Sequence, residues 1–155
     1  MTRRHLTRSV RCHIGRDVEQ LLNGVVPAKR KRDAKTMLDL MTRAAGQPPV
    51  VSGSIVGFGT YHYRYASGRE GDAPAAGFAP RRSALVVYVL DGVGAHADLL
   101  DGLGPHTKGV GCIYIKDLEL VDLSILEQIV TECYATLTAG TYTLRAREGG
   151  QSPTA

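Results

Sequence analysis

The stretch that decides the fold is GFGTYHYRYASGREGD, residues 57 to 72. Tyrosines alternate in it with a histidine and an arginine, and a period of two is typical of a β-strand with one buried face. The expected core face carries Tyr61, Tyr63 and Tyr65, and the expected solvent face carries His62 and Arg64. The glycines and Asp72 that follow are typical of a turn, because glycine adopts positive φ and aspartate accepts turn hydrogen bonds. The stretch therefore predicts a β-hairpin.

Further strands are predicted on both sides of this hairpin. From Val50 onward the chain is rich in β-branched and aromatic residues separated by glycines, a composition typical of strands and turns. Strands are expected at residues 54 to 59, 60 to 66, 75 to 80, 84 to 90 and 111 to 116. SALVVYVL, residues 83 to 90, is almost entirely apolar and predicts a central strand. Most connections have hairpin length, which favours antiparallel pairing.

Four helices are predicted from capping residues and from apolar residues at helical spacing. The first begins near Asp17, and the second follows Pro27 and ends at Gly46. A short helix lies between Val93 and Leu103, and the last begins after Asp122. The apolar stripes of the two long helices contain Ala34, Met37, Leu38, Met41 and Ala45, and Leu126, Ile129, Val130, Cys133 and Leu137.

The element order α-α-β-β-β-β-α-β-α predicts an α+β two-layer sandwich, with a mainly antiparallel sheet of about five strands covered by helices. The domain is expected at residues 17 to 138, between a basic arm at residues 1 to 16 and a tail at residues 139 to 155. Three cysteines without a CxxC pair give no cysteine-based metal site and favour a reducing compartment. No secretory leader and no apolar run of about 20 residues is found, so the prediction is a cytoplasmic protein without a membrane span.

Positive charge is concentrated at the front of the chain. Residues 1 to 35 contain ten Lys and Arg against three Asp and Glu. The second helix is expected to expose its basic residues opposite its apolar stripe: Lys29, Arg30, Lys31, Arg32 and Lys35. A basic surface attracts nucleic acid or an acidic partner. The tyrosines are better explained as core than as a platform for stacked bases, so nucleic acid is not the favoured partner.

A polar ligand site is predicted from cationic residues near the hairpin and near the glycine-rich loop GPHTKGVGC, residues 104 to 112. Backbone N–H groups of such a loop can bind an anion. The candidate ligand-binding residues are His62, Arg64, Arg81, Arg82, His106 and Lys108. Their convergence would form a cationic pocket for a small anionic ligand. The sequence does not identify that ligand or any cofactor. The equally weighted alternative is a solvated sheet face with internal ion pairs.

Three phrases of the chain closely resemble the bacterial YdhG-like domain family: SIVGFGTYHYRYASGREGD, FAPRR and LLDGLGPHTKGVGCIYIKDLELVDLSIL. The resemblance extends over roughly residues 17 to 137. It implies a compact α+β domain whose antiparallel sheet is covered by helices. The biochemical function of the family is generally unassigned, and some of its members are labelled frataxin-like iron chaperones.

The chain departs from the family pattern at two places. An aromatic residue usually stands where Val51 or Ser52 does, and a tryptophan commonly stands at the position of Ala73. If these aromatics cover a ligand pocket in the family, that pocket is altered here. The iron label is also poorly matched. Frataxin-type iron binding uses an acidic ridge on the first helix, whereas the corresponding helix of this chain is rich in Lys and Arg, with Asp33 and Asp39 as its main carboxylates.

The favoured interpretation is a non-catalytic module that binds a small ligand or anion, or acts as a chaperone. One alternative is an enzyme centred on His62, His106 and Cys112, although serine-hydrolase and HExxH motifs are absent from the sequence. Another alternative is a protein-interaction module, which a large exposed apolar patch or a sheet-edge contact would favour.

Overall fold

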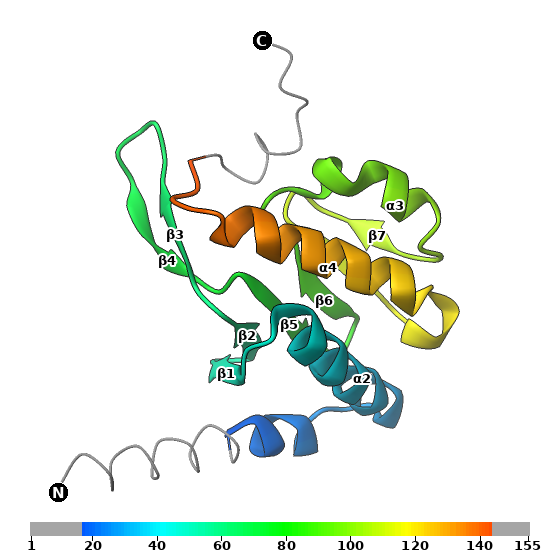
Figure 1. Cartoon of the computed structure of the whole chain (residues 1–155). Coiled ribbons are helices and arrows are strands. Elements are labelled where there is room, and N and C mark those ends of the chain that lie inside the picture. Colours follow the sequence, from blue (N-terminus) through cyan, green and yellow to red (C-terminus); the bar gives the residue numbers. More distant parts are fainter. Residues whose placement is uncertain (1–16, 144–155) are drawn as a thin grey trace, which may run out of the picture.

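The computed structural model describes residues 17–143, and it arranges them as a six-stranded antiparallel sheet with helices packed on it (Figure 1). The predicted arm, residues 1 to 16, and tail residues 144–155 lie outside the described residues. After helical residues 17–23, the elements are α2 (Ala28–Ala45), β1 (Pro49–Ser52), β2 (Ile55–Phe58), β3 (Tyr61–Arg64), β4 (Glu70–Ala73), β5 (Ala76–Pro80), β6 (Leu85–Tyr88), η1 (Val93–His96), α3 (Ala97–Asp101), β7 (Thr107–Lys108), β8 (Cys112–Ile115), η2 (Leu118–Leu120) and α4 (Leu123–Thr138). The predicted α+β sandwich is confirmed.

The main sheet has the strand order β1-β2-β5-β6-β8-β7, and each neighbouring pair is antiparallel. β6 occupies the central position that its apolar sequence predicts. Phe78 of β5 is opposite Val87 of β6, which is opposite Ile113 of β8, so the three side chains share one face. None of them has measurable solvent exposure. This row therefore lies in the core. Complete burial of each such side chain stabilises the fold by about 1.5–3 kcal/mol.

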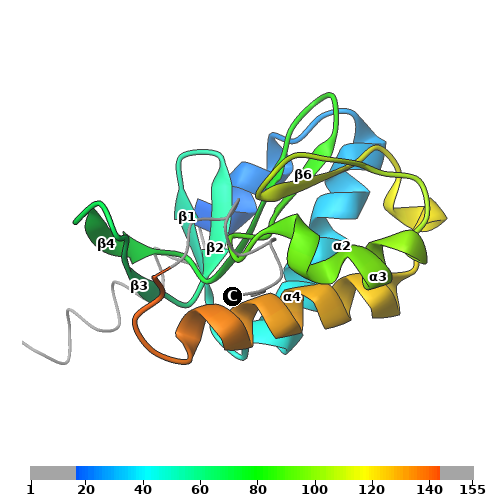
Figure 2. The same cartoon turned by 90° about the horizontal axis from the view of Figure 1, so that it is seen from above.

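α2 and α4 pack against each other and against β5 on this apolar face (Figure 2). Gly46 ends α2 in the left-handed conformation at φ 65°, and its N–H donates to the Thr42 carbonyl. The Asp122 side chain begins α4 by accepting from the backbone N–H of Ser124 and Ile125. Both helix ends are those predicted from the sequence. None of the helices formed by residues 17–143 is long and apolar enough to cross a bilayer.

The tyrosine-rich stretch forms a separate two-stranded ribbon of β3 and β4. Its side chains alternate within β3 as predicted, because Tyr61 is buried and Tyr63 packs on the core while His62 and Arg64 are exposed. Tyr65, which was also expected in the core, lies beyond β3 and is half-buried outside the core, where it stacks on Tyr63 with ring centroids 4.8 Å apart. The Tyr61 ring meets Tyr142 edge-on, with ring centroids 6.0 Å apart. The turn closes with a hydrogen bond from Tyr65 N to Arg69 O and contains Gly68 at φ 90°. The hairpin prediction is confirmed, but the turn is shorter than predicted: Gly71 and Asp72 belong to β4, where Asp72 is opposite His62.

Three strands, β1, β4 and β7, were not predicted. β4 has the sequence EGDA, whose residues have low strand propensity, so its partner β3 imposes the extended conformation. β1 begins with a proline and lies at the sheet edge, where a missing backbone donor is tolerated. β7 has only two residues, too few to show a periodic pattern.

The start of α2 is attached to the end of β8 by two buried charged side chains. Arg30 and Asp33 are 4% and 1% exposed, and Arg30 Nη1 lies 3.6 Å from Asp33 Oδ2. Arg30 Nη1 donates to the carbonyls of Ile115 and Lys116 at 3.2 and 3.1 Å. Asp33 Oδ2 accepts from Leu118 N at 3.0 Å. The pair therefore joins residues about 85 positions apart in the sequence.

A second set of ion pairs surrounds this buried pair. Arg32 contacts Asp33, Asp117 and Glu119, and Lys29 Nζ lies 3.2 Å from Asp117 Oδ2. The sequence predicts that these basic residues lie on an exposed face opposite the core. That interpretation is wrong for Arg30, which points inward, and incomplete for Lys29 and Arg32, whose counter-charges come from this chain.

Replacing Asp33 with alanine is expected to destabilise the fold by about 3–5 kcal/mol, because Arg30 would remain buried without its counter-charge and Leu118 N would lose its acceptor. Urea denaturation would measure the change in the free energy of unfolding. Asp39→Ala is the matched control, because Asp39 is an exposed carboxylate of the same helix. A loss below about 1 kcal/mol in Asp33→Ala would contradict a structural role for the buried pair.

Candidate functional site

His62 and Arg64 are held by carboxylates of their own hairpin. His62 Nδ1 lies 2.9 Å from Asp72 Oδ1, and Arg64 Nε donates to Glu70 Oε2 at 3.0 Å. All four side chains are largely exposed. The hydrogen bond with Asp72 and the nearby negative charges raise the pKa of His62. This arrangement matches the alternative in which the polar face of the hairpin carries internal ion pairs.

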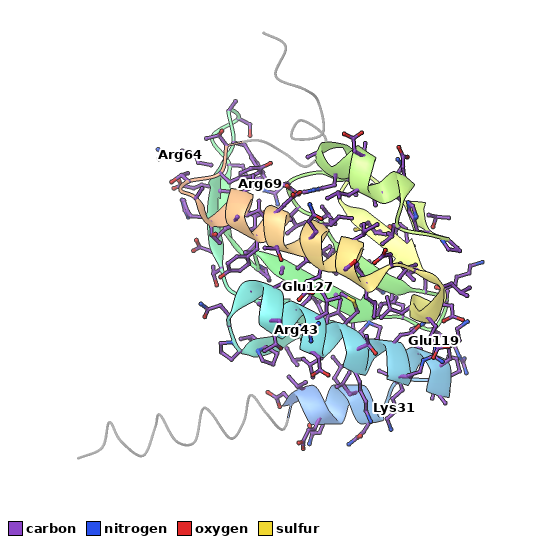
Figure 3. The ribbon with its side chains drawn as sticks, turned by 45° about the vertical axis from the view of Figure 1, so that its right-hand side comes forward. Lys31, Arg43, Arg64, Arg69, Glu119 and Glu127 are labelled. Atoms are coloured by element: carbon purple, nitrogen blue, oxygen red, sulfur yellow. The ribbon has the colours of Figure 1, made fainter. Side chains whose placement is uncertain are left out.

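The six predicted ligand residues do not converge on one pocket, which corrects the predicted arrangement. β2 and β5 are antiparallel, β3 follows the C-terminal end of β2, and Arg81 and Arg82 follow the C-terminal end of β5. The ribbon and the β5–β6 turn therefore lie at opposite ends of the strands. Figure 3 shows Arg64 on the ribbon far from Glu119, which lies in η2 just beyond the end of β8.

A cavity of about 460 Å³ lies at the end of the sheet away from the ribbon and contains one predicted residue, His106. We call it the basic pocket. It is lined by Lys29, Ala84, Pro105, His106, Thr107, Tyr114, Lys116, Asp117 and Leu120. The His106 side chain is fixed by a hydrogen bond from Nδ1 to the Gly104 carbonyl at 2.7 Å. The pKa of Tyr114 in the pocket wall is raised by Cys112 and by burial, and the charge of Arg81 in the nearby turn offsets only part of this effect.

Lys116 is a pocket residue that was not predicted from the sequence. Within residues 17–143 it has no carboxylate within ion-pair distance, whereas Lys29 is paired with Asp117. Strand alternation in CIYIK would have placed Lys116 on the same face as Tyr114, away from the core. The predicted Lys108 is exposed on β7, and alternation places it on the opposite face from Thr107, which lines the pocket.

A second cavity of about 460 Å³ lies near the ribbon end of the sheet. We call it the His96 pocket, lined by Asp91, Ala95, His96, Glu132, Ala135, Thr136 and Tyr142. His96 and Asp91 are 5% and 3% exposed, and His96 Nε2 lies 2.9 Å from Asp91 Oδ2. On the other side of the ring, His96 Nδ1 lies 3.4 Å from Glu132 Oε2. No sequence motif connects these three residues, which come from a loop, a 3₁₀ helix and α4.

The charge state of His96 is set by its two carboxylate neighbours. Burial by itself lowers the pKa of His96, but the hydrogen bond and charge of Asp91 and the charge of Glu132 outweigh burial, so the pKa is raised above its ordinary value of 6.5. Burial and the charge of Asp91 also raise the pKa of the neighbouring Cys133 thiol. Cys133 is therefore a neutral core residue at physiological pH.

Cys112 and His106 do not form the pair that the enzyme hypothesis requires. Thr107 is opposite Tyr114 in the sheet register, so His106 continues opposite Ile115, three residues from Cys112. Three strand residues span about 10 Å. Burial raises the pKa of the Cys112 thiol, and the effects of Tyr114 and Arg81 are too small to offset it. His62 is on the ribbon and does not approach either residue.

A smaller cavity of about 220 Å³ is lined by Ser52 and Ala73, at the two places where the chain departs from the YdhG-like pattern. Gly57 and Pro74 also line it, and Pro74 lies directly over the Gly57 backbone.

Among residues 17–143, no three His, Cys, Asp or Glu side chains are grouped so that they would hold a metal ion.

Comparisons with protein-family models, with curated proteins and with solved structures find no match to this chain. The resemblance to the YdhG-like family therefore stays a prediction, and the site is interpreted from its own geometry.

The stability of the protein is expected to fall as the pH rises above about 6.5. His96 has a higher pKa in the folded chain than its ordinary value, so its stabilising contribution is complete below that value and is lost as the pH passes the folded pKa. The limiting slope is about 1.4 kcal/mol per pH unit. Urea midpoints between pH 5.5 and 9 would measure it.

His96→Gln should flatten this pH dependence, because glutamine does not titrate. His62→Gln is the control for a histidine whose pKa is also raised but whose side chain is exposed, and most of the slope should remain in it. A slope that disappears in His62→Gln and persists in His96→Gln would contradict the assignment.

Alkylation of Cys112 by iodoacetamide at pH 7 is expected to be slower than that of free cysteine, because burial raises the pKa of its thiol and leaves less thiolate. Mass spectrometry of peptides would follow Cys112 and Cys133 separately. Labelling of Cys112 faster than free cysteine would instead support the enzyme hypothesis.

Proposed function

We propose that this protein is a non-catalytic binding module of the YdhG-like kind, which holds a small anionic ligand in the basic pocket. The observation that carries the proposal is the position of Lys116, an ammonium without an ion-pair partner among residues 17–143, at the wall of a cavity of about 460 Å³. Cavities of this size commonly hold small molecules. Lys29 lines the same cavity but is paired with Asp117, so Lys116 supplies the ammonium that is available to an anion.

The apolar part of the lining favours a ligand that is only partly charged. Tyr114 is 37% and Leu120 is 62% exposed, and Pro105 lies with them at the cavity wall. An exposed leucine and tyrosine next to a lysine fit an aromatic or aliphatic carboxylate, because both parts of such a molecule would be satisfied. The same lining offers no nucleophile paired with a base, which favours binding over catalysis.

Titration of the whole protein with benzoate and with inorganic phosphate would test this proposal. Benzoate is expected to bind more tightly than phosphate and to shift the amide resonances of Thr107, Tyr114 and Lys116 in a saturable way. Lys116→Gln should weaken binding by about 10- to 100-fold, the usual effect of removing a charge-assisted hydrogen bond. Added sodium chloride should also weaken binding.

Lys108→Gln is the matched control, since it removes one positive charge from the neighbouring strand without removing a residue of the pocket lining. Binding in this variant should remain within about twofold of the native value. Equal weakening in Lys108→Gln and Lys116→Gln would show that the anions respond only to net charge. No saturable shift with either anion would overturn the proposal.

A further inference from the structure

The His96 pocket differs from the basic pocket in the sign of its charge. Two carboxylates, Asp91 and Glu132, line it together with a single histidine, so its net charge is negative whether or not that histidine is protonated. The Glu132 side chain is 49% exposed and connects the pocket to solvent, whereas Asp91 and His96 are at its buried side. Anions are therefore disfavoured here, and cations are favoured.

The pocket also contains an unsatisfied nitrogen. His96 Nδ1 is buried and has no hydrogen-bond partner among residues 17–143, although Glu132 lies within ion-pair distance of it. Nε2 of the same ring is held by both carboxylate oxygens of Asp91, at 3.1 and 2.9 Å. This bond fixes the proton of a neutral ring on Nε2, which leaves the Nδ1 lone pair directed towards the Glu132 side of the pocket. A ligand that donates an N–H would satisfy both Nδ1 and Glu132.

The remaining walls suit an ammonium or guanidinium group attached to a short carbon chain. Tyr142 supplies an aromatic wall, and a cation near such a ring is attracted by its negative face. Ala95, Ala135 and Thr136 are small, so carbon atoms of a ligand have room beside the charged group. The volume of about 460 Å³ accommodates a molecule of this kind.

We propose that the His96 pocket is a binding site for a small organic cation, a primary amine or a guanidinium compound, held by Glu132 and by Nδ1 of neutral His96 against Tyr142. The site is separate from the basic pocket and does not depend on the function proposed there. Asp91 acts as a positioning residue, because it orients the imidazole ring without reaching the ligand.

Binding at this site is coupled to loss of a proton. The titratable groups that face His96 are Asp91 from the loop after β6, Glu132 and Cys133 from α4, and Tyr142 from the C-terminal segment. The two carboxylates hold the proton on His96, and an incoming cation replaces that proton as their counter-charge. Affinity for the cation therefore increases as the pH rises towards the pKa of His96, by up to about tenfold per pH unit.

Titration of the whole protein with n-butylammonium and agmatine, as chloride salts, would test the proposal by heteronuclear NMR between pH 6 and 8.5. Both probes stay protonated over this range. Saturable shifts are expected at the amides of Ala95, Thr136 and Tyr142, with affinity that rises with pH. Butyrate and sodium chloride at the same ionic strength should leave these resonances unchanged.

Glu132→Gln should weaken binding of the ammonium probes by at least about tenfold, because it removes the exposed carboxylate of the site. Glu127→Gln is the matched control, because it removes the same charge from α4 at a position paired with Arg43 on the side of α2 (Figure 3). Absence of saturable shifts in the pocket, equal binding in Glu132→Gln and native protein, or an affinity independent of pH would each overturn the proposal. Shifts at Thr107 and Lys116 with anions belong to the basic pocket and decide the other proposal separately.

Discussion

At the start of α2, two opposite charges, Arg30 and Asp33, are almost completely removed from water. Burial of each ion costs several kcal/mol unless its partners are well placed. Here the guanidinium reaches the last carbonyl groups of β8, and the carboxylate accepts a backbone N–H of η2. These bonds hold the start of α2 against the end of β8 and η2. The same position brings Lys29 beside Lys116 and Asp117, so the geometry of the basic pocket depends on a contact outside it.

The fold separates two polar regions of different character along the direction of its strands. Arg81 lies in the turn after β5, His106 in the loop before β7 and Lys116 at the end of β8, whereas Asp91 and Glu132 lie towards the ribbon. The long connection from β6 to β7 contributes to this separation, because it has Asp91 near its start at the ribbon end, passes through η1 and α3, and reaches His106 at the opposite end. An anion and an organic cation would therefore occupy distant sites, and neither would have to displace the other.

Local physical rules predicted much of the fold. Alternation in YHYRY gave the buried and exposed faces of β3, and the roles of Gly46 and Asp122 as helix ends followed from backbone conformation and capping. The candidate site was predicted less well, because charged residues take their positions from distant partners. Arg30 points inward because Asp33 and carbonyl groups 85 or more positions away bind it. His96 meets Glu132 only through packing of α4, which leaves no pattern in the sequence.

Tyr142 belongs to two parts of the molecule at once. Its backbone N–H donates to His62 O and its carbonyl accepts from Arg64 N, so it continues the pairing of the ribbon. Its hydroxyl donates to the Asp91 carbonyl at 3.4 Å, and its ring forms a wall of the His96 pocket. The ribbon and the pocket therefore share one residue as a mechanical link. A partner that displaced the hairpin on binding would therefore move one wall of the cavity. By thermodynamic reciprocity, a ligand in the cavity would then change the affinity of the hairpin for that partner.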